Sequence, residues 1–159
     1  MKLFCTLAPA GAATALMGQA PNTDTVNAMY DSLMVYNIAW PKTVLAVAAF
    51  ETGWFQCKNC TFKYNNMFGF RNNSGYLKFN TISDCLAYLK NWQDTYYVPW
   101  QDKHPTGNYY DFLIYIHYAH NMPVYLRKVK YVEKWLTENL DALKPELDPA
   151  KEHTVPAVH

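Results

Sequence analysis

The chain has 159 residues, a net charge of +1, and a composition that is 50% hydrophobic, 16% aromatic and only 17% charged. This length suits one domain. The net charge is small and no runs of Lys or Arg occur, so the sequence does not predict a nucleic-acid-binding surface. No stretch of about 18 apolar residues occurs, so no membrane span is expected. The aromatic excess has two explanations of equal weight: an aromatic core, or a groove in which rings stack on sugar faces.

The first 22 residues are interpreted as a leader or a loose N-terminal arm. Lys2 precedes an apolar, alanine-rich run from Leu3 to Met17 that ends in small residues, as a secretory signal does. Pro9 and Gly11 interrupt that run, and so a cleaved signal and a loose arm both remain open.

Two helices are predicted next. Residues 23–36 form an amphipathic pattern that Asn37 breaks. The inward face of this helix is Val26, Met29, Tyr30 and Leu33. The second helix runs from Pro41, which suits the first helical position, to about Glu51, and Gly53 can end it. Because this helix is apolar on nearly every face, it is expected to lie buried in the centre of the domain.

A β-hairpin and a third helix are predicted after a polar loop at residues 56–65. The segments 66–70 and 75–79 flank the turn residues 71–74, which is typical of a hairpin. Thr81 and Asp84 resemble a capping box at the start of the third helix. Its inward residues are expected to be Leu86, Leu89, Trp92 or Gln93, and Tyr96. Residues 99–107 are expected to form a loop.

Two more helices complete the predicted elements. Asn108 is expected to cap a helix that continues through Phe112, Ile116 and Ala119. Pro123 opens a last long helix with apolar residues at helical spacing. These residues are Leu126, Val129, Val132 and Leu136.

The predicted fold class is mainly α, a helical domain with one small β-hairpin. No alternation of strands and helices occurs, which argues against a doubly wound sheet. The domain is expected to span residues 23–143, between the arm of residues 1–22 and a loose C-terminal tail of residues 144–159 that carries three prolines.

Four cysteines stand at positions 5, 57, 60 and 85, and Cys57 and Cys60 form a C-x-x-C motif. A zinc site needs four ligands at suitable spacing, and no second C-x-x-C or paired histidine motif is present. We therefore expect no bound metal and no cofactor. Buried thiols and a local disulfide both remain open for this pair.

Glu51 is the focal candidate for chemistry. It is the one acid in the apolar helix and lies in its last turn, with Phe50, Trp54 and Phe55 as neighbours. Burial and the negative end of the helix dipole would both favour its protonated form, and no Lys or Arg close in sequence would offset them. A carboxylic acid that stays protonated near neutral pH is what cleavage of a glycosidic bond requires. The alternative is a glutamate at a helix end that points to water.

Several segments of the chain resemble bacterial glucosaminidases of glycoside hydrolase family 73. A-A-F-E-T-G-W-F at residues 48–55 is similar to the family's A-x-x-E-[ST]-G-W segment, and N-N-M-F-G-F at residues 65–70 is similar to its N-N-L-F-G segment. Three further matches follow in the same order, so the resemblance covers residues 25–135. They are Gly75–Phe79, Asp84–Tyr88, and Tyr109–Leu113 with Tyr118-Ala119.

The resemblance implies a lysozyme-like helical fold with no cofactor, and cleavage of β-1,4 bonds in N-acetylglucosamine-containing glycan. It implies that Glu51 is the catalytic acid and that Tyr118 lies in the active site. Residues expected to contact the glycan are Asn66, Phe68, Gly69, Trp54 and Tyr76. The alternative for Tyr118 is one more core aromatic, and Phe68 and Gly69 could equally cover the core from the hairpin.

Two departures from the family pattern stand out. Where relatives read Y-A-T-D-P-x-Y, residues 118–125 read Y-A-H-N-M-P-V-Y, which is one residue longer and lacks the acid. No Asp or Glu occurs between Glu51 and Asp84, so the hairpin supplies no second carboxylate. Either the substrate's 2-acetamido group attacks, or Tyr118 with Asn65 and Asn66 orients a water. Three other acids could act only if the fold brings them near: Asp94, Asp102 and Asp111.

The sequence therefore predicts a peptidoglycan hydrolase of the endo-β-N-acetylglucosaminidase type, acting on peptidoglycan glycan strands. A lytic transglycosylase, which also needs one acid, and a non-catalytic glycan-binding or structural module are the alternatives. Such a protein would work outside the cytoplasm, in the periplasm or after secretion, or on a phage particle. The sequence does not indicate an oligomeric state.

Overall fold

The computed structural model describes residues 21–140, and these form a mainly helical structure with one small antiparallel sheet. Most of the predicted arm (1–22), the predicted tail (144–159) and Cys5 lie outside the described residues. Asn22 lies at the boundary and caps the first helix, α2 (Thr23–Val35), by accepting a hydrogen bond from the backbone N–H of Thr25. None of the helices in the described part combines the length and the apolar content that a membrane span requires.

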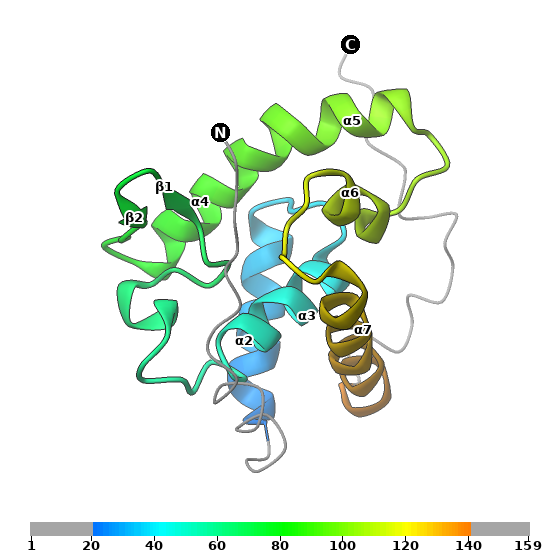
Figure 1. Ribbon diagram of the computed structural model, residues 1–159. Coiled ribbons are helices and arrows are strands. Elements are labelled where there is room, and N and C mark those ends of the chain that lie inside the picture. The colour runs from blue at the N-terminus through cyan, green and yellow to red at the C-terminus, as the bar shows by residue number, and fades with distance from the viewer. Residues whose placement is uncertain (1–20, 141–159) are drawn as a thin grey trace.

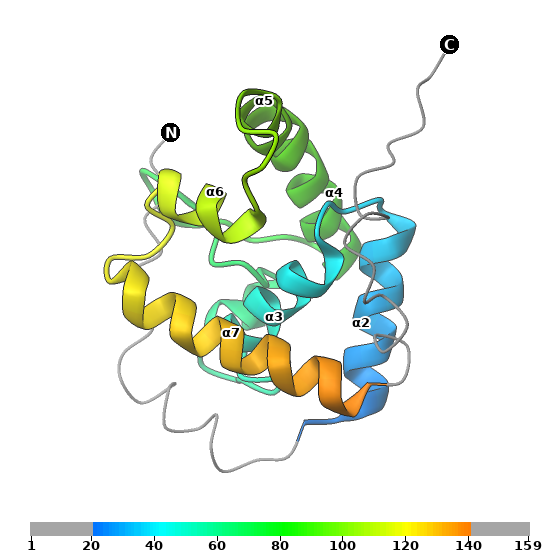
Figure 2. The same cartoon turned by 90° about the vertical axis from the view of Figure 1, so that its right-hand side faces the viewer.

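Helix α3 (Pro41–Glu51) is the centre of the structure, as its apolar sequence predicted. Its residues 43–49 are all buried. The helix packs against α2 and against the long helix α7 (Met122–Asn139). Figures 1 and 2 show α3 enclosed between these two helices, with α6 (Tyr109–Tyr115) above it. The predicted inward face of α2 is confirmed, because Val26, Met29, Tyr30 and Leu33 are all buried.

A long helical segment crosses the top of the molecule in Figure 1. It consists of α4 (Ile82–Trp92), a π-helical turn (Gln93–Tyr97) and α5 (Val98–Lys103). The predicted capping box is confirmed, because Thr81 and Asp84 each accept a hydrogen bond from the other's backbone N–H. The prediction of a loop from residue 99 is wrong, because the helix continues through Pro99. A π turn just before a proline loosens the hydrogen-bond ladder that the proline ring would otherwise disrupt.

The π turn also changes which side chain points inward. Tyr96 was predicted to face the core, but it is 41% exposed, whereas Tyr97 is 4% exposed. A π turn adds one residue to a helical turn, and so it moves the inward position one place along the chain. Tyr97 packs against Tyr109 and Phe112 of α6, with ring centroids 5.2 Å apart in both cases.

The sheet is smaller than predicted, and its turn is shifted. Strands β1 (Arg71–Asn72) and β2 (Gly75–Tyr76) pair in register, with Arg71 opposite Tyr76 and Asn72 opposite Gly75. The predicted four-residue turn at 71–74 is therefore wrong, and the turn consists of Asn73 and Ser74. Before the sheet, the polar loop contains a 3₁₀ turn, η1 (Thr61–Tyr64).

Helix α6 is shorter than expected, and α7 begins where Pro123 predicted. Asn108 caps α6, and the predicted continuation through Ala119 is wrong because the helix ends at Tyr115. His117 has a left-handed backbone with φ of +51°, which an α-helix cannot contain. Residues 116–121 therefore form a loop that carries Tyr118 between the two helices.

Candidate active site

Glu51 is the last residue of α3, and the chain turns sharply after it. Gly53, Trp54 and Phe55 follow one another with φ near +60°, a conformation that is unusual for residues other than glycine. Thr52 stabilises this turn, because its hydroxyl donates to the carbonyl of Ala48 at 2.7 Å and accepts from the N–H of Phe55 at 2.9 Å. The T-G-W-F sequence thus ends the central helix at Glu51 and directs the chain away from it.

The side chain of Glu51 is half-buried and is held by Tyr125 of α7. The Tyr125 hydroxyl donates a hydrogen bond to Oε1 of Glu51 at 2.9 Å. The Tyr125 ring, itself buried, packs edge-on against Phe50 with centroids 5.4 Å apart. One oxygen of the candidate acid is therefore fixed by a residue 74 positions away in the sequence.

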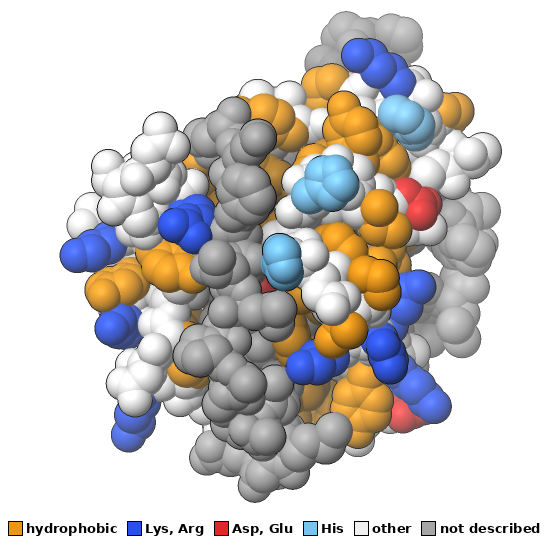
Figure 3. All heavy atoms as spheres, in the orientation of Figure 1, with side chains coloured by type: hydrophobic (Ala, Val, Ile, Leu, Met, Phe, Trp, Pro, Cys, Tyr) orange, Lys and Arg blue, Asp and Glu red, His pale blue; other side chains and the backbone are white. Residues whose placement is uncertain are grey.

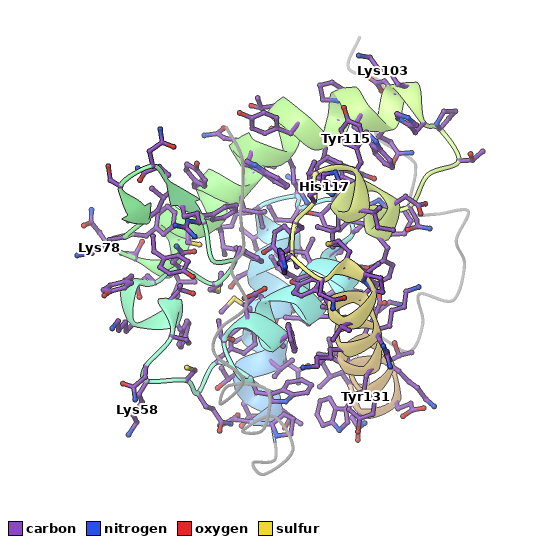
Figure 4. The ribbon with its side chains drawn as sticks, viewed as in Figure 1. Lys58, Lys78, Lys103, Tyr115, His117 and Tyr131 are labelled. Carbon is purple, nitrogen blue, oxygen red and sulfur yellow. The ribbon has the colours of Figure 1, made fainter. Side chains whose placement is uncertain are left out.

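Tyr118 lies beside Tyr125 and joins the same cluster. The two rings are 5.5 Å apart, and the Tyr118 hydroxyl donates to the backbone carbonyl of Phe68 at 2.7 Å. Tyr118 is 3% exposed, in the loop that follows the labelled His117 in Figure 4. The structure thus brings Glu51, Tyr118 and Phe68 together through Tyr125, although Tyr118 itself is directed to Phe68.

Asn66 is fully buried and holds the base of the hairpin. Its side-chain amide donates to the carbonyls of Phe70 and Leu77 at 2.7 and 2.9 Å, and its Oδ1 accepts from the N–H of Phe70 at 2.9 Å. These bonds use both amide hydrogens, so Asn66 holds the backbone of the hairpin in this structure. Phe68 and Gly69 are buried as well, and Gly69 has φ of +64°.

Trp54 and Tyr76 occupy different surroundings. Trp54 is buried, and its ring lies edge-on to Trp135 of α7 at 4.8 Å. It also lines a cavity of about 1060 Å³ beside the loop after Glu51. Tyr76 is 38% exposed on β2, with its ring 5.5 Å from the guanidinium of Arg71.

The other acids considered from the sequence have partners away from Glu51. Asp111 accepts from the backbone N–H of Asn108 at the start of α6, as its position predicted. Asp94 forms an ion pair with Lys90, one turn earlier on the same helical segment. Asp102 is exposed on α5.

Sequence reasoning missed Tyr125 and Glu133. Tyr125 lies inside the motif compared with the family, but no role was predicted for it. Glu133 accepts hydrogen bonds from Thr43 of α3 at 2.7 Å and from Tyr110 of α6. Burial and the nearby Glu133 carboxylate raise the pKa of Tyr110 far above its ordinary value. No sequence motif signals such a network, which joins three helices.

The cysteines of the described residues are free thiols. Cys57 and Cys60 are half-buried, and the Cys60 thiol donates to the Cys57 carbonyl at 3.5 Å. Burial raises the pKa of Cys60 and of the fully buried Cys85 to about 12. Within residues 21–140, no group of three or more His, Cys, Asp or Glu side chains is placed to hold a metal ion.

Comparison with known proteins gives this cluster no assignment. No family model, curated protein or solved structure matches the chain. The family resemblance and the roles that it implies therefore stay predictions.

Proposed function

We propose that this protein is a glycoside hydrolase of bacterial peptidoglycan that cleaves β-1,4 bonds in N-acetylglucosamine-containing glycan. The observation that carries the proposal is the hydrogen bond from Tyr125 to Glu51 at the end of the buried helix α3. Tyr125 in turn packs against Tyr118, whose hydroxyl donates to Phe68, so the candidate acid lies close to segments that are far apart in the sequence. The same segments carry the resemblance to glucosaminidases.

In this proposal, Glu51 protonates the oxygen of the leaving sugar. The partial negative charge at the C-terminal end of α3 disfavours a carboxylate there, and partial burial acts in the same direction. Tyr125 fixes the orientation of the carboxyl group, because it engages Oε1 at 2.9 Å. General acid catalysis of this kind contributes roughly 10²–10⁴-fold to the rate.

The second half of the reaction needs an attacking group. Asp94, Asp111 and Glu133 are engaged elsewhere, which favours the substrate's own 2-acetamido oxygen or a water as the attacker. Tyr118 would support either route by accepting a hydrogen bond, because its own proton is directed to the Phe68 carbonyl.

The test is the Glu51→Gln variant, assayed by clearing of a suspension of purified peptidoglycan. We expect a loss of roughly 10²-fold or more with an unchanged melting temperature, because the side chain keeps its shape but has no proton to transfer. Asp94→Asn, Asp102→Asn and Asp111→Asn are the matched controls and should each cost far less activity. Near-full activity of a folded Glu51→Gln protein would remove Glu51 from the mechanism.

Mass spectrometry of the released fragments identifies the bond that is cleaved. Reducing-end glucosamine is expected for a glucosaminidase. An anhydro product would instead indicate a lytic transglycosylase, whose single acid Glu51 would equally supply. Binding to peptidoglycan without any released fragment would indicate a glycan-binding module and contradict the proposal.

A further inference from the structure

Residues 52–83, which we call the basic lobe, form one side of the molecule next to Glu51. The lobe contains the turn after α3, η1 and the β1–β2 hairpin. It has no Asp or Glu, and its four charged residues are Lys58, Lys63, Arg71 and Lys78. Figure 3 shows Lys and Arg side chains along this edge with no acidic side chain among them. Figure 4 places Lys58 and Lys78 on the same side, far from Lys103 on α5.

Aromatic rings accompany these cations. The ammonium groups of Lys63 and Lys78 lie 4.9 and 5.1 Å from the centre of the Tyr64 ring. The three lysines of the lobe are exposed, so their charges face solvent. In contrast, Lys90 and Lys134 on the helices each have a carboxylate partner one turn away.

A cavity of about 1060 Å³ opens between this lobe and the start of α2. Its apolar wall includes Trp54, Phe55 and Phe62, and Lys58 and Lys63 also line it. The described residues that line it include no acid. The volume is slightly above the usual range for small-ligand sites, which is about 300–1,000 Å³. Its chemistry suits a ligand that carries both aliphatic groups and negative charges.

We propose that the basic lobe and this cavity bind the peptide stem of peptidoglycan through its carboxylates, while the glycan lies at Glu51. This inference rests on the proposed function, since it names the second part of the same substrate. Trp54 begins the cavity wall three residues after Glu51, and Phe68 of the lobe contacts Tyr118. The lobe therefore adjoins the cluster around the candidate acid.

A phosphate polymer of the cell wall is a less suitable ligand. Lysines bind phosphate and carboxylate groups alike, so the charges alone do not distinguish the two ligands. The apolar wall of Trp54, Phe55 and Phe62 makes the distinction, because it suits a ligand with aliphatic side chains beside its negative charges. A short peptide with aliphatic side chains and free carboxylates matches both features.

The experiment measures binding to purified peptidoglycan sacculi by co-sedimentation, in the Glu51→Gln background so that the sacculi stay intact. The lysine pair variant is Lys58→Gln with Lys63→Gln, and the control pair is Lys103→Gln with Lys134→Gln. All four side chains are exposed, so the fold should be unaffected. Each variant is tested on intact sacculi and on glycan strands from which an amidase has removed the peptide stems.

We expect the lysine pair variant to bind intact sacculi about five- to tenfold more weakly at low salt, as two exposed ion pairs allow. Its binding to stripped glycan should equal that of the parent, and the control pair should change neither. Binding of the parent to intact sacculi should weaken as salt is added.

Three results would overturn the proposal. They are full binding of the lysine pair variant to intact sacculi, an equal loss on stripped glycan, and a loss that disappears once hydrofluoric acid has removed phosphate polymers from the sacculi. Failure of the wild-type protein to release glycan fragments would contradict the proposed function instead. That outcome is read from a different assay and leaves the sedimentation comparison unaffected.

Discussion

The helical core and the basic lobe meet at Glu51, but different interactions stabilise them. The core is built from apolar side chains, and Leu45 at the centre of α3 is fully buried between α2 and α7. The lobe has only four residues in strands. Its backbone is held instead by amide side chains: Asn65 donates to the carbonyls of Phe79 and Asn80, and Asn66 bonds to Phe70 and Leu77.

This difference follows from the requirement that buried backbone groups be hydrogen-bonded. Helices satisfy their own N–H and C=O groups, so their side chains are free to be apolar. An irregular loop must find partners elsewhere, and the side chains of Asn65 and Asn66 provide them. The candidate acid belongs to the helical core, whereas Phe68, which contacts Tyr118, belongs to the basic lobe. If the two regions are stabilised separately, substitutions in one should leave the other folded.

The largest expected effect concerns the reactivity of two thiols, one in each region. With a pKa raised from 9.0 to about 12, Cys60 and Cys85 should both be alkylated roughly 10³-fold more slowly than an ordinary thiol at pH 8. Because the thiolate is the reactive form, the rate at Cys60 should keep rising with pH up to about 12. Peptide mapping of the alkylated protein measures each site separately.

The two thiols should differ in their response to denaturant. Cys85 is fully buried on α4, so its alkylation requires unfolding and should accelerate strongly in mild urea. Cys60 is half-buried in the lobe and should respond less. Equal acceleration of both sites would show that the core and the lobe open as one unit.

In the core, Leu45→Ala should lower the free energy of unfolding by about 2–5 kcal/mol, because it leaves a cavity among fully buried side chains. Chemical denaturation measures the change. Val35→Ala on α2 is the control, since Val35 is 77% exposed and should contribute little. A loss below about 1 kcal/mol for Leu45→Ala would mean that α3 is not the centre of the core.

In the lobe, Asn66→Ala should cost about 2–3 kcal/mol, because it leaves the N–H of Phe70 and the carbonyl of Leu77 without their side-chain partner, while the carbonyl of Phe70 keeps only the N–H of Leu77. Hydrogen exchange should show the loss of protection first in residues 66–79. Asn73→Ala, at the exposed hairpin turn, is the matched control. Uniform loss of protection across α3 and α7 would contradict separate stabilisation.

The smallest expected effects concern the tyrosines where the regions meet. Tyr125→Phe should lower kcat on a soluble chitooligosaccharide about tenfold with little change in KM, because Tyr125 orients Glu51 and not the bound sugar. If Tyr125→Phe raised KM alone, Tyr125 would be a glycan contact and not a positioning residue.

Tyr118→Phe removes the hydrogen bond to the carbonyl of Phe68 and should lower the free energy of unfolding by about 1 kcal/mol.

Apolar periodicity and capping residues determined most of the helices in advance. The bounds of α3 followed from Pro41 and from the unbroken apolar run, and the starts of α4 and α6 followed from Thr81 and Asn108. These signals are local, since a cap or a helix face involves residues within four positions of each other. The position of Glu51 at the end of a buried helix could therefore be predicted from sequence alone.

Only the tertiary structure decided that the helix continues through Pro99 and that Tyr125 is hydrogen-bonded to Glu51. The π turn at Gln93–Tyr97 forms where Tyr97, rather than Tyr96, packs on α6, and no local pattern specifies that choice. No role was predicted for Tyr125, which lies on the buried face of α7. Its hydroxyl reaches Glu51 only because α3 and α7 pack side by side. Hydrogen bonds between distant side chains depend on such packing, and short-range sequence patterns do not encode it.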